Sequence, residues 1–131
     1  MTTDAQHHPT QTMTTPQGGQ VEIDVLLVPV ITELWRLGYA TLRSCQNGGE
    51  STLAGTTGAP KADIQRLAAY NQGKAWVTIR EEDGPRLLAA VDALNPDFEW
   101  RSHQARTPGW VSITIPTDRL DDAAVLLRQL R

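Results

Sequence analysis

A short run of polar and glycine residues has the composition of a binding or reactive site. Ser44, Cys45 and Gln46 come at the end of a predicted strand and are followed by Gly48 and Gly49. Backbone N–H groups in glycine-rich turns can hold an anion. A thiol beside positive charge loses its proton more readily and becomes nucleophilic. The run therefore predicts a small polar pocket at this strand end.

Residues elsewhere in the chain could act together with this run. Asp24 precedes a predicted helix, which it could cap, or it could face a ligand. His103 is the single histidine of the predicted folded region and could pair with Cys45, while Arg43 or Arg80 could supply positive charge. Cys45 could equally pack as a small hydrophobic residue. The candidate catalytic residues are Cys45 and His103, and the candidate ligand-binding residues are Asp24, Arg43, Ser44, Cys45, Gln46 and Gly48.

The sequence does not match the common motifs of metal or cofactor sites. One cysteine and one histidine in the folded region, without spaced carboxylates around them, do not make a tetrahedral zinc site. We therefore expect no metal. The glycine pattern matches neither the phosphate-binding loop of nucleotide hydrolases nor the dinucleotide-binding fingerprint. The cofactor, if there is one, is left open by the sequence.

Length and charge limit the class of protein. The chain has 131 residues and a formal charge of −3, with 12 Lys plus Arg and 15 Asp plus Glu. This size fits one domain. The negative charge argues against binding driven by bulk positive charge, so we do not expect nucleic acid among the partners. No apolar run approaches the roughly 20 residues that span a bilayer, and no secretory leader is visible. We expect a soluble, cytoplasmic protein that does not bind membranes.

Periodicity predicts one α+β domain over residues 21–131, after a disordered tail over residues 1–20 that is rich in Thr, Gln, Pro and Gly. Helices are predicted from about 25–29 to 37, at 61–70, 85–94 and 118–130, and strands at 40–45, 75–80, 98–104 and 110–115. A glycine-rich loop is predicted at 46–60, and Thr117 is expected to cap the last helix. The order α-β-(α)-β-α-β-β-α favours a two-layer sandwich, with about four mostly antiparallel strands and helices on one face.

Alternation along the predicted strands gives the sheet two unlike faces. An apolar set should pack beneath the helices: Leu42, Val77, Ile79, Phe98, Trp100, Val111, Ile113 and Ile115. The opposite set contains Thr41, Arg43, Cys45, Trp76, Thr78, Arg80, Glu99, Arg101, His103, Trp110, Ser112 and Thr114. Aromatic and Arg side chains together are typical of protein-binding surfaces. A homodimer or another protein partner is expected on the surface around Trp76, Trp110 and Arg101, unless this is an ordinary hydrated face.

The first part of the predicted domain resembles a known family. Its pattern is Asp24, then Pro29, a helix with Leu34-Trp35 before Gly38, and Thr41 before Ser44-Cys45-Gln46. This is similar to a family of small bacterial and phage-associated proteins, in which Ser-Cys-Gln or Ser-Cys-Glu is followed by Gly. Here Asn47 stands between Gln46 and Gly48. The Ser-Cys theme is also similar to the Ser-Cys-Ser-Gly-Arg start of tRNA wybutosine-synthesis methyltransferases. The resemblance implies a helix–strand–turn unit and no particular activity.

Three functions remain open from the sequence. The first is a small binding or accessory domain with a polar pocket at the end of the strand. The second is a thiol-dependent enzyme that uses Cys45, activated by His103 or an Arg. The third is an accessory protein that associates with nucleic acid, suggested by Trp76, Trp110 and the arginines.

Overall fold

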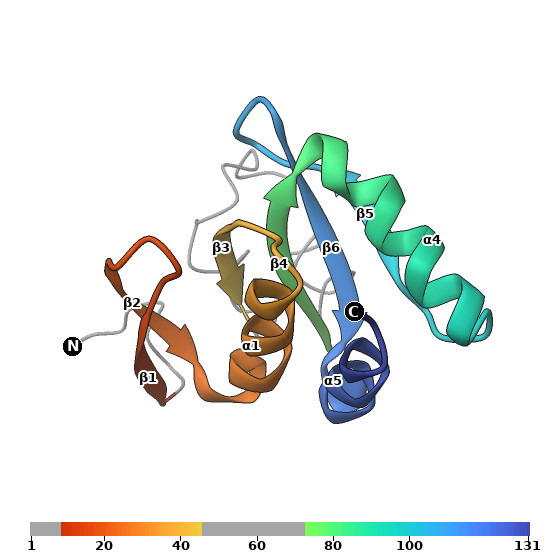
Figure 1. Cartoon of the computed structure of the whole chain (residues 1–131), viewed down its shortest axis with the longest axis horizontal. Helices are drawn as coiled ribbons and strands as arrows, with labels where there is room; N and C mark the ends of the chain where they lie inside the picture. The colour runs from red at the N-terminus through yellow and green to blue at the C-terminus, as the bar shows by residue number, and fades with distance from the viewer. Residues whose placement is uncertain (1–8, 46–72) are drawn as a thin grey trace, which may run out of the picture.

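The computed structural model describes residues 9–45 and 73–131. These ranges form two antiparallel sheets and three α-helices, which confirms the α+β class. The larger sheet has the order β3-β4-β6-β5, formed by β3 (Thr41–Cys45), β4 (Lys74–Arg80), β6 (Trp110–Pro116) and β5 (Arg101–Gln104). Helices α1 (Val28–Arg36), α4 (Gly84–Leu94) and α5 (Leu120–Arg128) lie on one face of this sheet (Figure 1).

One local arrangement occurs three times in the described chain. A strand leads through a three-residue 3-10 turn directly into a helix, at Val25–Leu27 before α1, Glu81–Asp83 before α4 and Thr117–Arg119 before α5. Thr117 was predicted to cap the last helix, but it begins this turn. Its carbonyl oxygen accepts the N–H of Leu120, so α5 begins two residues later than the predicted start at 118.

The hydrophobic core lies between the sheet and the helices. Val77 and Ile79 on β4 and Ile113 and Ile115 on β6 are buried, as alternation predicts. Their neighbours from the helical layer are the fully buried side chains Leu27, Val30, Ile31, Leu34, Leu87 and Leu127. The predicted helices at 85–94 and 118–130 and the strands at 75–80 and 110–115 therefore correspond to observed elements, with ends shifted by a few residues.

Helix α1 ends at Arg36, close to the predicted end at 37, and Gly38 follows its last turn. This glycine has a φ of +90°, which favours a residue without a Cβ. The N–H of Gly38 donates to the Trp35 carbonyl at 3.0 Å, and the N–H of Tyr39 donates to the Leu34 carbonyl at 2.9 Å. This pair of bonds is the Schellman ending, which turns the chain from α1 into β3.

A hairpin occupies part of the region predicted to be a disordered tail. Strand β1 (Thr10–Thr14) pairs with β2 (Gln20–Asp24), so the prediction for residues 1–20 is wrong from residue 10 onward. The alternating threonines give β1 a polar side, and Met13 on the other side packs against the core. Alternation of this kind stabilises a strand even when few residues are hydrophobic.

Strand β5 is shorter than predicted. The predicted strand covered 98–104, whereas β5 begins at Arg101. Before it, the N–H of Phe98 donates to the Asn95 carbonyl at 3.2 Å, and that of Trp100 to the Phe98 carbonyl at 3.0 Å. These local bonds replace pairing with β6. Glu99, predicted to lie within the sheet, therefore lies outside it.

Candidate functional site

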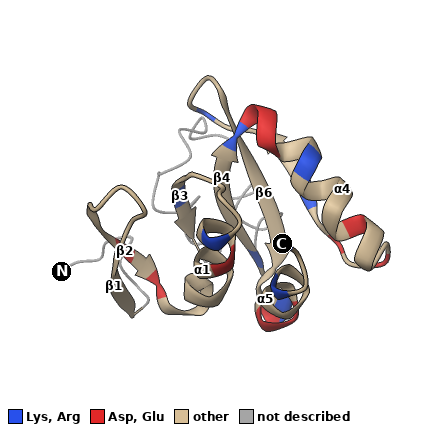
Figure 2. Cartoon of the chain, in the orientation of Figure 1, with Lys and Arg blue, Asp and Glu red and all other residues tan. Residues whose placement is uncertain are grey.

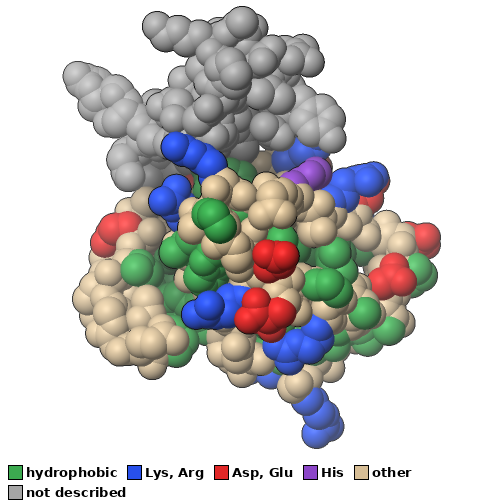
Figure 3. Space-filling model, turned by 90° about the horizontal axis from the view of Figure 1, so that it is seen from above, with side chains coloured by type: hydrophobic (Ala, Val, Ile, Leu, Met, Phe, Trp, Pro, Cys, Tyr) green, Lys and Arg blue, Asp and Glu red, His purple; other side chains and the backbone are tan. Residues whose placement is uncertain are grey.

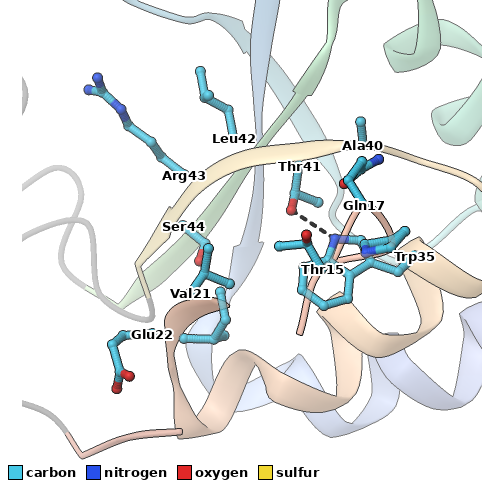
Figure 4. A pocket seen from close by; sticks show the side chains of 12 residues that line it. Thr15, Gln17, Val21, Glu22, Trp35, Ala40, Thr41, Leu42, Arg43 and Ser44 are labelled. Atoms are coloured by element: carbon cyan, nitrogen blue, oxygen red, sulfur yellow. Dashed lines mark hydrogen bonds between the residues drawn. The ribbon is translucent and has the colours of Figure 1, made fainter. Parts of the chain in front are cut away.

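A pocket of about 390 Å³ lies between the β1–β2 hairpin and β3, the outer strand of the larger sheet (Figure 4). We call it the hairpin pocket. Its apolar lining includes Val21, Ile23 and Trp35, and its neutral polar lining includes Thr15, Gln17, Thr41 and Ser44. Volumes of this size are typical of sites for small ligands.

A β-bulge in β3 decides which side chains face this pocket. Thr41 lies opposite Ile79 and Ser44 opposite Val77, so the two residues between them, Leu42 and Arg43, share one position on β4. Figure 4 shows that Leu42 and Arg43 point to the other side of β3 from Thr41. The bulge thus allows Thr41 and Ser44, three positions apart in the sequence, to share the hairpin side of β3.

The bulge overturns two of the predicted positions on the sheet. Leu42 was expected in the core but is 43% exposed. Thr41 was expected on the face opposite the helices, yet its hydroxyl accepts a hydrogen bond of 2.9 Å from the indole N–H of Trp35 on α1. Simple alternation fails here because the extra residue puts Leu42 and Arg43 on one side of β3 and leaves Thr41 on the other.

The Trp35–Thr41 hydrogen bond fixes an aromatic ring and a hydroxyl side by side in the hairpin pocket. A threonine hydroxyl carries one donor and two acceptor positions. The indole N–H of Trp35 uses one acceptor position, so the hydroxyl proton of Thr41 can be donated to another group. The site thus combines an apolar surface with a hydrogen-bond donor.

Glu22 lines the pocket from β2, but its carboxylate is engaged by the hairpin itself. Thr10 donates a hydrogen bond to Glu22 Oε1 at 2.8 Å, and Thr12 donates a short one to Oε2. The bond from Thr12, followed by that from Thr10, lowers the pKa of the Glu22 carboxyl. In Figure 4 this carboxylate points away from Trp35 and Thr41. The part of the pocket beside Trp35 is therefore lined by neutral groups.

The structure brings together some of the predicted ligand-binding residues. Arg43 and Ser44 line the hairpin pocket from opposite sides of β3. Asp24 ends β2 at the N-cap position of the following 3-10 turn, makes no capping hydrogen bond through its side chain, and does not line the pocket. Gln46 and Gly48 lie outside the described residues, as do the predicted loop at 46–60 and the predicted helix at 61–70.

Cys45 and His103 do not form the predicted dyad. Cys45 lies opposite Trp76 on β4, and His103 lies opposite Ser112 on β6. Two strands separate them, which corresponds to about 14 Å at the usual strand spacing. A proton transfer needs a hydrogen-bond distance. The ring Nε2 of His103 instead lies 3.5 Å from the Thr114 hydroxyl.

The Trp, Arg and His side chains of β4, β5 and β6 lie on the sheet face opposite the helices, as alternation predicts. Trp76 and Arg80 lie there on β4, and Arg101 and His103 on β5 face Thr114 and Ser112. The Arg80 guanidinium lies 4.9 Å from the centre of the Trp110 ring. Thr78 and Ser112 lie in the middle of this face, with their hydroxyl oxygens 3.4 Å apart.

Two further features are absent from residues 9–45 and 73–131. No group of three or more His, Cys, Asp or Glu side chains there could hold a metal ion. Among the helices of the same ranges, none combines the length and the apolar character that a membrane crossing requires.

Sequence reasoning missed the hairpin side of the pocket. Residues such as Thr15, Gln17 and Val21 were included in the tail or at its end. Two signals were available. Thr10, Thr12 and Thr14 alternate, and the run at 16–19 reads Pro-Gln-Gly-Gly, which is typical of a turn between two strands.

Comparisons of the chain with protein-family models, curated proteins and solved structures found no match. The segment that carries the resemblance described above forms the 3-10 turn, α1 and β3, and it contributes Trp35, Thr41 and Ser44 to the hairpin pocket.

Proposed function

We propose that this chain is a binding domain that holds a small neutral ligand in the hairpin pocket. The observation that carries the proposal is the pocket itself, about 390 Å³ between two separate sheets. Val21, Ile23 and the ring of Trp35 offer apolar contact, and Thr41 and Ser44 offer hydroxyl groups.

The lining favours a particular chemical class of ligand. The Thr41 hydroxyl, held by Trp35, has a proton to donate, so the ligand should carry an acceptor such as a carbonyl oxygen. Arg43 points away from the hairpin side of β3, which argues against an anion as the main ligand of this pocket. An aromatic or aliphatic body with one amide or carbonyl group fits best.

The tryptophans allow a direct test of ligand binding in the hairpin pocket. The chain has four tryptophans, so protein labelled with 5-fluorotryptophan should give four fluorine signals. Trp35 lines the hairpin pocket, whereas Trp100 lies beside Phe98, with ring centres 5.3 Å apart. Titration with neutral aromatic amides, benzamides first, should shift the Trp35 signal and leave Trp100 unchanged. Single Trp→Phe variants assign the signals.

Two variants and a control make the test specific. Val21→Phe should fill the pocket and remove the Trp35 response, while Val125→Phe, at an exposed position on α5 outside the pocket, should retain it. Thr41→Val should weaken binding roughly fivefold, the loss expected for one neutral hydrogen bond. If no amide shifts Trp35, or if Val21→Phe responds like the parent protein, the proposal is wrong.

A further inference from the structure

The Lys, Arg and His side chains of the larger sheet share one face, and no acidic side chain lies on its strands. Pairing across β4, β6 and β5 places their ionisable groups on the face opposite the helices, and the bulge adds the side chain from β3. We call this surface the basic face, and its Lys, Arg and His residues are Arg43, Lys74, Arg80, Arg101 and His103.

Acidic residues are placed elsewhere in the described chain. Figure 2 shows them on the 3-10 turn after β4, on the helices and on the hairpin strand β2. In Figure 3, Lys and Arg side chains lie on both sides of the His side chain along one margin of the view. The formal charge of −3 is therefore unevenly distributed, and it does not describe the local charge of this face.

Aromatic rings accompany these charges. Trp110 on β6 lies beneath the exposed Arg80 guanidinium, 4.9 Å from its ring centre, so the two form a stacked pair. Trp76 lies on the same face of β4, four residues before Arg80. Strand geometry then separates the two indoles by about 14 Å. They would contact bases that are not neighbours in a strand, because stacked neighbours are about 3.4 Å apart.

We propose that the basic face binds single-stranded nucleic acid. Arg43, Arg80 and Arg101 are exposed and contact backbone phosphates, and Trp110 stacks on a base. The hydroxyls of Ser112 and Thr114 offer hydrogen bonds to base edges or sugars. A single strand fits better than a duplex, because an indole on a sheet needs a base that is not already stacked.

This proposal reverses an expectation drawn from the sequence. The negative charge of the chain argues against nucleic acid, and alternation along the predicted strands places the acidic Glu99 within this face. Glu99 lies before β5, outside the paired strands, and the acidic residues of the described chain lie off the basic face. The two premises therefore do not apply to this surface.

Fluorescence anisotropy of labelled 12-nucleotide RNA and DNA single strands tests the proposal on the full chain. Binding should weaken as salt rises, since phosphate contacts release counterions. Arg80→Gln and Arg101→Gln should each weaken binding and reduce the slope of log affinity against log salt by about 0.7. Arg86→Gln on α4, also exposed, is the matched control and should bind as the parent protein does.

Stacking separates nucleic acid from other polyanions. Trp110→Leu should weaken binding roughly five- to a hundredfold, and Trp110→Phe should retain most of it. Circular dichroism and thermal melting of each variant show whether it folds. Absence of binding at 50 mM salt would overturn the proposal. The proposal would also be overturned if heparin or an acidic protein bound as tightly as RNA and if Trp110→Leu did not weaken that binding. Such a result would indicate a surface for polyanions in general or for a protein. The Trp35 fluorine signal reports the hairpin pocket separately.

Discussion

At the scale of single residues, Gly38 determines how β3 reaches the hairpin pocket. Its φ of +90° ends α1 and lets the N–H groups of Gly38 and Tyr39 bond back to the last turn. No neighbouring atom would meet a Cβ at this position. The constraint is therefore conformational and not steric, because L-residues are disfavoured in left-handed backbone.

Gly38→Ala should reduce the free energy of unfolding by about 1–2 kcal/mol, since alanine must adopt the same positive φ. Urea unfolding followed by circular dichroism measures the change. Gly19→Ala is the matched control, because Gly19 has no positive φ and an added Cβ would meet only an ordinary contact. Equal losses in the two variants would contradict the conformational explanation.

At the scale of elements, α1 and α5 are joined by a charged cluster around Glu33. Arg36 Nε donates to Glu33 Oε1 at 2.6 Å, and Arg128 Nε donates to Oε2 at 3.3 Å. Arg36 also donates to the carbonyls of Leu127 and Leu130 at the end of α5. Because Glu33 is only 8% exposed, this cluster fixes the two helices relative to each other.

The same cluster makes stability depend on pH. The hydrogen bond from Arg36 is the largest cause that lowers the pKa of the Glu33 carboxyl from its ordinary value of 4.5, and Arg128 adds to it. A lowered carboxyl pKa stabilises the fold above the unfolded value, and this contribution is lost as pH falls through the folded value.

Glu33→Gln should cost about 1 kcal/mol at pH 7, since both arginines stay partly exposed and can be hydrated. Below about pH 4.5 the difference from the parent protein should shrink. Urea unfolding between pH 3 and pH 7 measures it, with the exposed Glu99→Gln as control. A loss that is constant across this range would show that Glu33 acts through packing and not through its charge.

Elements with regular periodicity could be predicted from the sequence, and irregular ones could not. β4, β6 and α4 follow the alternation or helical spacing of residues such as Val77, Ile113 and Leu87. β5 was placed less well, because Asn95 accepts hydrogen bonds locally and delays the strand. The hairpin was missed because its threonines resemble the composition of a tail.

At the scale of the whole molecule, the candidate sites depend on contacts between distant segments. The hairpin pocket needs β2 beside β3, and no local pattern specifies this pairing of two separate sheets. The Cys45–His103 pair was plausible from residue types alone but fails on strand order. The basic face is the opposite example. The negative net charge gave no indication of a basic surface, and only the pairing of the strands places these basic residues together.

The bulge in β3 has a consequence for association between copies of the chain. Unpaired outer strands attract strands of other molecules, and an extra residue makes such pairing irregular. At the opposite side, β5 is only four residues long and fully exposed, and it carries Arg101. Both outer strands of the larger sheet are thus poor templates for further growth.

Deleting Leu42 would leave one residue of β3 opposite Thr78 and make the strand regular. We expect this variant to self-associate at lower concentration than the parent protein, as light scattering would measure, although an exposed apolar side chain has been removed. Leu42→Ala, which keeps the bulge, should remain as dispersed as the parent, and equal scattering from the deletion variant would contradict the expectation. The extra residue of the bulge in β3 would then protect the protein from aggregation through its outer strand.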